Sequence, residues 1–156
     1  FEFYIRLSVS EKNPGCLVMK AYEFIDHTAD IGLKANGKDL SEAFAHAAEG
    51  MFDIITDSSA IESNGEYHIE LSSDDLEQLL VDWLNELLFL QGAENLVFGR
   101  FSVDVDEQQV CLSATVSGEE FDTKKHSIGM EIKAVTYHLL EVHKNDPCFV
   151  KVLFDI

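Results

Sequence analysis

The segment 22–32 combines carboxylates, an imidazole and a hydroxyl with apolar residues, in the order YEFIDHTADIG. Polar side chains also interrupt hydrophobic residues in the segments 131–138 and 152–156. Side chains of these types can bind a cation or transfer protons, so the first segment is interpreted as part of a site and not only as a strand. The three segments together predict one polar patch built from separate parts of the chain.

The oxygen donors at the two ends of the chain favour a metal site. Asp30 and Asp155 offer carboxylates, and Ile156 adds its carbonyl oxygen and a terminal carboxylate. The alternating pattern of 150–156 predicts a strand that would hold these last groups in place. Oxygen donors suit a hard cation, with Ca²⁺ as the first choice and Mg²⁺ or Mn²⁺ as alternatives, whereas zinc or copper would prefer more imidazole or thiolate. The alternative is that Asp30 caps a turn and Asp155 is simply exposed.

Lys133 lies in a segment whose polar residues alternate between two faces. In an extended strand Lys133 and Tyr137 share one face while Thr136 and His138 share the other, so they form one cluster only if the strand is bulged or twisted. This pattern argues against a tight catalytic arrangement. Lys133 is interpreted as a cation that moderates repulsion between the aspartates when no metal is bound.

Catalytic motifs are absent from the sequence. It contains no GxSxG, GxGxxG, HExxH or phosphate-loop pattern, and no nucleophile can be nominated. His126 and His138 have no recognisable partner and are interpreted as structural or solvent-exposed, His46 as solvated, and Cys148 as a small hydrophobic residue. A stand-alone metal-dependent hydrolase is therefore the least favoured function.

The composition indicates one acidic globular domain. The 156 residues are 46% hydrophobic and 10% aromatic, which is enough for a substantial core. The 11 Lys and Arg residues against 29 Asp and Glu residues give a net charge of −18, which repels a nucleic-acid backbone. Direct nucleic-acid binding is therefore not expected. A cation or a basic protein is a better partner, although an acidic surface also serves solubility alone.

The cysteines and the hydrophobic segments indicate a cytoplasmic protein without a membrane anchor. Cys16, Cys111 and Cys148 are odd in number and lack CxxC spacing, so neither a disulfide framework nor a zinc–thiolate site is predicted. The longest apolar segment, 76–90, is interrupted by acidic residues and is too short to span a bilayer. Residues 1–18 precede a Met-Lys pair that resembles a translation start, and they are interpreted as an N-terminal extension of unclear origin before a single domain, 19–156.

Hydrophobic periodicity predicts an α+β fold. Strands are expected over 28–36 and 67–71, each followed by an amphipathic helix that begins with an acidic cap, at Asp39 and at Asp74. The second helix is expected to end at Gln91-Gly92. Two hairpins follow, 97–105 with 110–116 and 130–142 with 148–154, and 118–125 is expected to be a polar loop. This order predicts a two-layer sandwich in which two helices pack on one face of a mostly antiparallel or mixed sheet.

Five segments resemble the archease family and follow its order. They are YEFIDHTADIGLKANGKDLSEAF, AAEGMFDIITD, LLVDWLNELLFL, EIKAVTYHLLEV and the terminal VLFDI. The resemblance covers about residues 22–156, and its most specific parts are HTAD, KAVTYH and FDI. It implies a compact α+β sandwich, in agreement with the pattern above.

The resemblance implies an accessory protein that is not itself an enzyme. Archease-like proteins activate the RtcB-type RNA ligase of tRNA splicing by promoting its GTP-dependent guanylylation and repeated turnover. The family's metal ligands correspond to Asp30, Asp155 and the backbone oxygen or terminus of Ile156, and roles in ligase activation fall on Lys133 and His27. The alternative that the family suggests is chaperone-like modulation of a tRNA cytosine methyltransferase.

Overall fold

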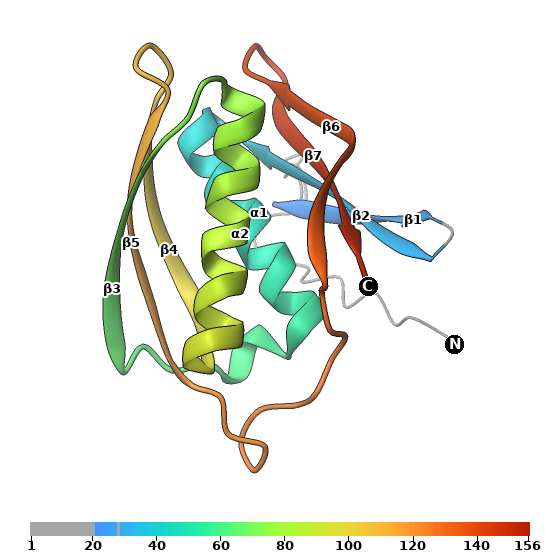
Figure 1. Cartoon of the computed structure of the whole chain (residues 1–156), viewed down its shortest axis with the longest axis vertical. Helices are drawn as coiled ribbons and strands as arrows, with labels where there is room; N and C mark the ends of the chain where they lie inside the picture. Colours follow the sequence, from blue (N-terminus) through green and yellow to red (C-terminus); the bar gives the residue numbers. More distant parts are fainter. Residues whose placement is uncertain (1–20, 28) are drawn as a thin grey trace, which may run out of the picture.

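Two helices lie between two antiparallel β-sheets (Figure 1). The computed structural model describes residues 21–27 and 29–156, so the predicted extension 1–18 lies outside the described residues. One sheet has the order β1-β2-β7-β6, formed by β1 (Tyr22–His27), β2 (Asp30–Gly37), β7 (Cys148–Asp155) and β6 (Ala134–His143). The other has the order β3-β5-β4, formed by β3 (Gly65–Ser72), β5 (Cys111–Glu120) and β4 (Leu96–Asp106). The helices are α1 (Leu40–Ile55) and α2 (Leu76–Glu94), and a short 3₁₀ turn, η1 (Ser58–Ala60), follows α1.

The helix α1 is at the centre of the core. Asp39 caps its first turn by accepting the backbone N–H of Glu42 at 2.9 Å, as the sequence predicts. The helix contacts β2 and β7 on one side and β4 on the other. It can do so because small and large apolar residues, among them Ala43, Ala47 and Phe44, are buried around most of its circumference. The fully buried Trp83 of α2 donates its indole N–H to the Phe44 carbonyl at 3.0 Å and joins the two helices.

The α+β class, the two helices and the antiparallel strands are confirmed, but the strands form two sheets instead of one. The sequence analysis places both helices on one face of a single sheet. A helix with one apolar stripe needs only one sheet, whereas α1 and α2 present apolar residues to both sides and need a second layer. The arrangement is therefore a β/α/β sandwich with the helices inside (Figure 1).

Several element boundaries differ from the prediction. Asp75, not Asp74, caps α2, by accepting the backbone N–H of Gln78 at 2.7 Å. The helix continues through Gly92 to Glu94 and ends at Asn95, whose φ of 56° is the left-handed conformation that terminates helices. The predicted strand 28–36 is β2, and the preceding residues form a separate strand, β1, paired with it.

The strand β5 also extends further than predicted, to Glu120, through part of the expected loop 118–125. Gly118 makes this possible because it lies against the neighbouring strand β4: a Cβ atom at this position would stand 1.9 Å from the carbonyl oxygen of Val97. Only glycine allows so close an approach of two backbones. The extra strand residues carry Glu119 into a polar cluster that is described below.

The loop 121–133 joins the two sheets and is attached to the C-terminal end of α1. The backbone N–H groups of Gly129 and Met130 donate to the carbonyl oxygens of Ile55 and Ile54 at 2.9 and 2.8 Å. The last carbonyls of a helix lack partners within the helix, so the loop satisfies them. Thr56 adds a hydroxyl donation to the Ser127 carbonyl at 2.6 Å. Among the described residues, no helix is long and apolar enough to cross a bilayer.

Candidate functional site

Asp30 and Asp155 lie directly opposite each other on neighbouring strands. Asp30 begins β2 and Asp155 ends β7, and the eight-residue register between these strands pairs the two. Opposite residues of an antiparallel pair place their Cβ atoms on the same face, about 4.5–5.5 Å apart. Asp155 is exposed and Asp30 half-buried. The structure therefore brings together the two carboxylates that the sequence analysis predicts as metal ligands.

Lys133 is placed at the same end of the sheet. Its backbone N–H donates to the carbonyl oxygen of Asp155 at 2.7 Å, and the next residue, Ala134, pairs with Asp155 as the first residue of β6. Lys133 thus precedes the strand, so strict alternation along β6 does not fix its side chain. The side chain is exposed, which leaves its charge available at the surface near the two aspartates.

His27 completes a row of paired positions across the four-stranded sheet. His27 ends β1, and its backbone pairs with Asp30 at the start of β2, so the two strands form a hairpin; Ala29, just before β2, has a φ of 63°. The sequence of pairs is His27 with Asp30, Asp30 with Asp155, and Asp155 with Ala134. We call these four positions the strand-end row. All the segments that the sequence singles out for chemistry meet there.

The oxygen donors of the strand-end row are of the type that a hard cation prefers, but they are too few to complete its coordination. Asp30 and Asp155 supply two carboxylates, and Ile156, whose side chain packs against the core, follows with a backbone carbonyl. Among the residues that the structure describes, no group of three or more His, Cys, Asp or Glu side chains is placed to hold a metal. Calcium takes 6–8 oxygen ligands, so a cation here would draw on backbone oxygen, water or a partner protein.

Comparison with known proteins identifies the family. The model of the archease protein family matches residues 22–156, which include the whole strand-end row. The chain belongs to the archease family. The protein archease of Sulfolobus acidocaldarius is 41% identical over 132 residues, which cover 85% of this chain and 95% of that protein. The protein archease of Methanothermobacter thermautotrophicus is 41% identical over 141 residues, which cover 88% of this chain and 100% of that protein.

A solved archease-like structure supports the fold. The solution structure of Methanobacterium thermoautotrophicum protein 1598 matches with a TM-score of 0.78 at 41% identity, and the match covers 88% of this chain and 100% of that one. The resemblance stated from the sequence is thereby confirmed at the level of family and fold. The metal ligands and the roles of Lys133 and His27 stay predictions.

A second polar cluster in this protein was not predicted. It centres on Glu119, whose carboxylate receives the Lys125 ammonium at 2.8 Å and the His126 Nε2 at 2.7 Å. The Asn64 amide donates to the same carboxylate at 2.7 Å, and the Glu62 backbone N–H also donates to it, at 3.1 Å. We call these five residues the Glu119 cluster. Residues 62–64 and 119–126 are far apart in the sequence, so no local spacing could have indicated it.

The Glu119 cluster is built around the buried side chain of His126. The His126 side chain is fully buried, stacks on Phe121 at 5.5 Å between ring centres, and accepts the backbone N–H of Asp122 at Nδ1 at 2.9 Å. An accepting Nδ1 leaves Nε2 as the protonated nitrogen that donates to Glu119. His126 therefore has a positioned partner that the sequence did not reveal, and its structural interpretation is confirmed.

The surroundings of Glu119 hold it in the charged form. The hydrogen bond from Lys125, followed by those from the Glu62 backbone and His126, lowers the pKa of Glu119 to about 2. The same ion pair raises the pKa of Lys125. The cluster borders a hollow of about 1030 Å³ lined also by Tyr67 and Asn95. Its polar groups satisfy one another, which indicates that it fastens the loop 121–133 onto the three-stranded sheet.

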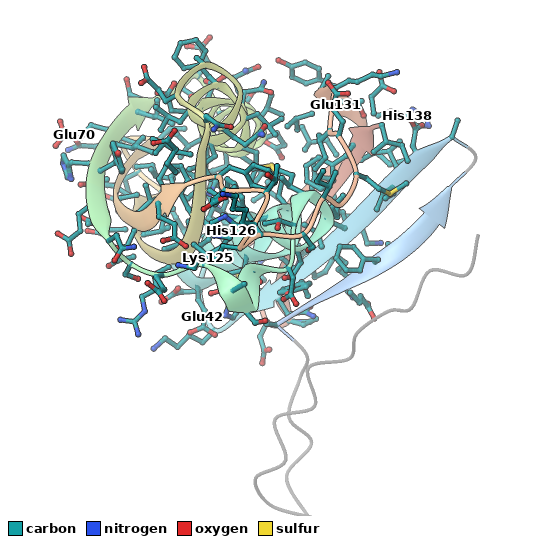
Figure 2. All side chains as sticks on the ribbon, turned by 90° about the horizontal axis from the view of Figure 1, so that it is seen from below. Glu42, Glu70, Lys125, His126, Glu131 and His138 are labelled. Atoms are coloured by element: carbon teal, nitrogen blue, oxygen red, sulfur yellow. The ribbon has the colours of Figure 1, made fainter. Side chains whose placement is uncertain are left out.

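Three further residues named in the sequence analysis, His46, His138 and Cys148, lie outside both clusters. The sequence analysis interprets His46 as solvated, and this is wrong. His46 is half-buried on α1, and its Nδ1 lies 2.5 Å from the Asn36 carbonyl oxygen. His138 is exposed, at the β6 edge of the molecule and well away from Lys125 and His126 (Figure 2). Cys148 is buried at the start of β7, and burial raises the pKa of its thiol, which confirms it as a small core residue.

Proposed function

We propose that this protein activates an RtcB-type RNA ligase of tRNA splicing, by promoting the GTP-dependent guanylylation of the ligase and its multiple turnover. Membership of the archease family supports this role. The observation that carries it is the direct pairing of Asp30 with Asp155. Two carboxylates on adjacent strands, with the backbone of Lys133 hydrogen-bonded to the backbone of Asp155, form a rigid site that a flexible acidic surface would not provide.

In this proposal, the strand-end row is the contact that activates the ligase, and it supplies no nucleophile of its own. Asp30 and Asp155 would hold a divalent cation, Ca²⁺ by preference, and the cation would supply a positive charge that attracts oxygen donors of the partner. Lys133 would reduce the repulsion between the carboxylates when the cation is absent. The net charge of −18 favours approach to a basic mouth of the ligase, because opposite charge accelerates encounter.

The test is a ligation assay with substoichiometric protein, GTP and divalent metal. We expect the wild-type chain to convert slow, single-turnover ligation into multiple turnover, and Asp30→Ala to abolish the stimulation while the protein stays folded. Asp104→Ala is the matched control, because Asp104 is also exposed but lies on β4 of the other sheet. Full stimulation by Asp30→Ala would refute the proposed role of the row.

The family's other suggested role has a different signature. If the chain instead suppressed aggregation of a tRNA cytosine methyltransferase, and did so equally well with Asp30→Ala, a chaperone-like function independent of the strand-end row would be supported. Turnover of a small substrate by the purified chain alone would contradict an accessory role of either kind.

A further inference from the structure

The strand β6 is interrupted by a large bulge. Thr136 pairs with Leu153 of β7, but the next paired residue of β6 is Glu141, which lies opposite Lys151. Four residues of β6, 137–140, therefore face a single residue of β7. We call them the bulged segment. β6 is also the outer strand of its sheet, so the bulge interrupts an exposed edge.

The bulged segment is not optimised for the isolated protein. Leu139 has a φ of 57°, a left-handed conformation that a branched apolar residue adopts only under constraint. Thr136, at its start, has a buried hydroxyl that finds no hydrogen-bond partner in the described part of the chain. Such features concentrate where a segment serves recognition more than stability.

Two large apolar side chains of the bulged segment point to solvent. Tyr137 and Leu139 are each 62% exposed. The Tyr137 hydroxyl is nevertheless held, because the amide Nε2 of Gln78 on α2 lies 3.2 Å from it and 2.8 Å from the carboxylate of Asp82. An aromatic ring that is oriented before binding loses little conformational freedom on contact, which is typical of residues that dominate protein interfaces.

The charge around the bulged segment indicates the chemistry of its partner. The contact with Gln78 places Tyr137 beside the first turn of α2, where Asp74, Asp75 and Glu77 are exposed. The same strand leads back to Ala134, paired with Asp155 in the strand-end row. The apolar side chains thus have acidic groups at both ends. A complementary surface would be an apolar pocket flanked by lysine or arginine side chains.

We propose that the bulged segment is the apolar anchor with which this protein docks on its partner protein, through Tyr137 and Leu139 inserted in an apolar pocket with a basic rim. The inference rests on the proposed function, since the partner is the RNA ligase. It assigns affinity to the bulged segment and activation to the strand-end row. A second copy of this chain is disfavoured as the occupant, because each copy carries a charge of −18.

The experiment measures both direct binding to the ligase and stimulation of ligation. Tyr137→Ser and Leu139→Asn remove the apolar groups, and asparagine accepts the left-handed conformation at position 139. Each is expected to raise both the dissociation constant and the concentration for half-maximal stimulation about tenfold or more, with unchanged maximal stimulation. Ile128→Ser is the matched control, because Ile128 is 79% exposed but lies in the loop 121–133. Unfolding midpoints verify that the variants fold.

The outcomes separate the anchor from the proposed function. If Tyr137→Ser and Leu139→Asn bind the ligase and stimulate ligation as well as the wild type does, the anchor is refuted and the proposed function is unaffected. Asp30→Ala is expected to bind and yet fail to stimulate, and equal loss of binding in all three variants would refute the division of roles. Absence of both binding and stimulation by the wild type would refute the function together with the anchor. A wild-type dimer in sedimentation that Tyr137→Ser dissociates would assign the segment to self-association and overturn the proposal.

Discussion

The backbone N–H of Lys133 donates to the carbonyl oxygen of Asp155 at 2.7 Å. This bond closes the loop 121–133 against the end of β7 immediately before β6 begins. The position of the lysine at the strand-end row is therefore set by its main chain, while its side chain stays exposed. The two contributions can be separated by substitution.

Lys133→Ala removes the side chain and keeps the backbone bond, whereas Lys133→Pro removes the bond itself. We expect Lys133→Ala to change the free energy of unfolding by less than about 0.5 kcal/mol, as an exposed substitution does, and to reduce ligase stimulation. Lys133→Pro should destabilise the protein by about 1 kcal/mol or more, since the Asp155 carbonyl loses its donor. Chemical denaturation and the ligation assay measure the two effects. Equal stability of the two variants would show that the backbone bond contributes nothing.

Divalent metal is expected to stabilise the protein through Asp30 and Asp155. A cation that binds only the folded state at 100 times its dissociation constant adds about 2.7 kcal/mol to the free energy of unfolding. Titration with Ca²⁺, then Mg²⁺ and Mn²⁺, should raise the unfolding midpoint of the wild type and of the control Asp104→Asn. Asp30→Asn and Asp155→Asn should lose this response. A shift of the same size in all four proteins would indicate a cation bound elsewhere.

The Glu119 cluster predicts a specific dependence of stability on pH. The pKa of Glu119 is lowered from its ordinary value of 4.5 to about 2, so its charged form stabilises the folded state above pH 4.5. That contribution is lost as the pH falls through this interval, because the carboxylate becomes protonated in the folded state as well. The wild type should exceed Glu119→Gln in stability near neutral pH, and the difference should shrink towards pH 2. Denaturation midpoints measured at a series of pH values would refute this if the difference stayed constant.

Gly129 is expected to tolerate no side chain. A Cβ atom there would lie 2.3 Å from the Ile54 carbonyl oxygen and 2.7 Å from that of Ile55, both rigid backbone atoms at the end of α1. Gly129→Ala should therefore destabilise the protein by about 1–3 kcal/mol. Because the loop leads to Lys133, it should also reduce ligase stimulation.

Gly92→Ala is the control for this substitution. Gly92 lies within α2, and a Cβ there would meet nothing within 4 Å. Alanine should therefore stabilise the helix, by about 1 kcal/mol. Thermal unfolding of both variants provides the comparison, and destabilisation of similar size at the two positions would contradict the steric argument.

Local pattern was sufficient to predict most elements of the fold. The period of α1 and its Asp39 cap, and the alternation of the two C-terminal hairpins, are properties of neighbouring residues. The division into two sheets was not predicted, because it depends on which strands pair across the whole chain. The segment 22–32 was interpreted as a site as well as a strand, but its division into two paired strands, β1 and β2, was not predicted.

The candidate site shows the same limit. Asp30 and Asp155 were predicted as companions from their residue types, the positions of their segments and a family resemblance, and the register of β2 with β7 brings them opposite each other. Nothing local indicated that Glu119 would meet His126 and Asn64, since that cluster forms only when β5 extends past Gly118 and the loop folds back. The sequence analysis stated that the polar residues of 133–138 could form one cluster only if their strand were bulged or twisted. The structure contains a bulge in this strand, β6.

The pairing of β2 with β7 also determines when the site can exist during synthesis. Asp30 and Asp155 are 125 positions apart in the chain (155 − 30), and β7 is the last strand of the described fold. Contacts this distant in sequence form late, since most of the chain must be ordered or closed into a loop before they are made. A nascent chain therefore cannot present both carboxylates until the ribosome has released β7. Incomplete copies that lack β7 would lack Asp155 and could not assemble the paired carboxylates.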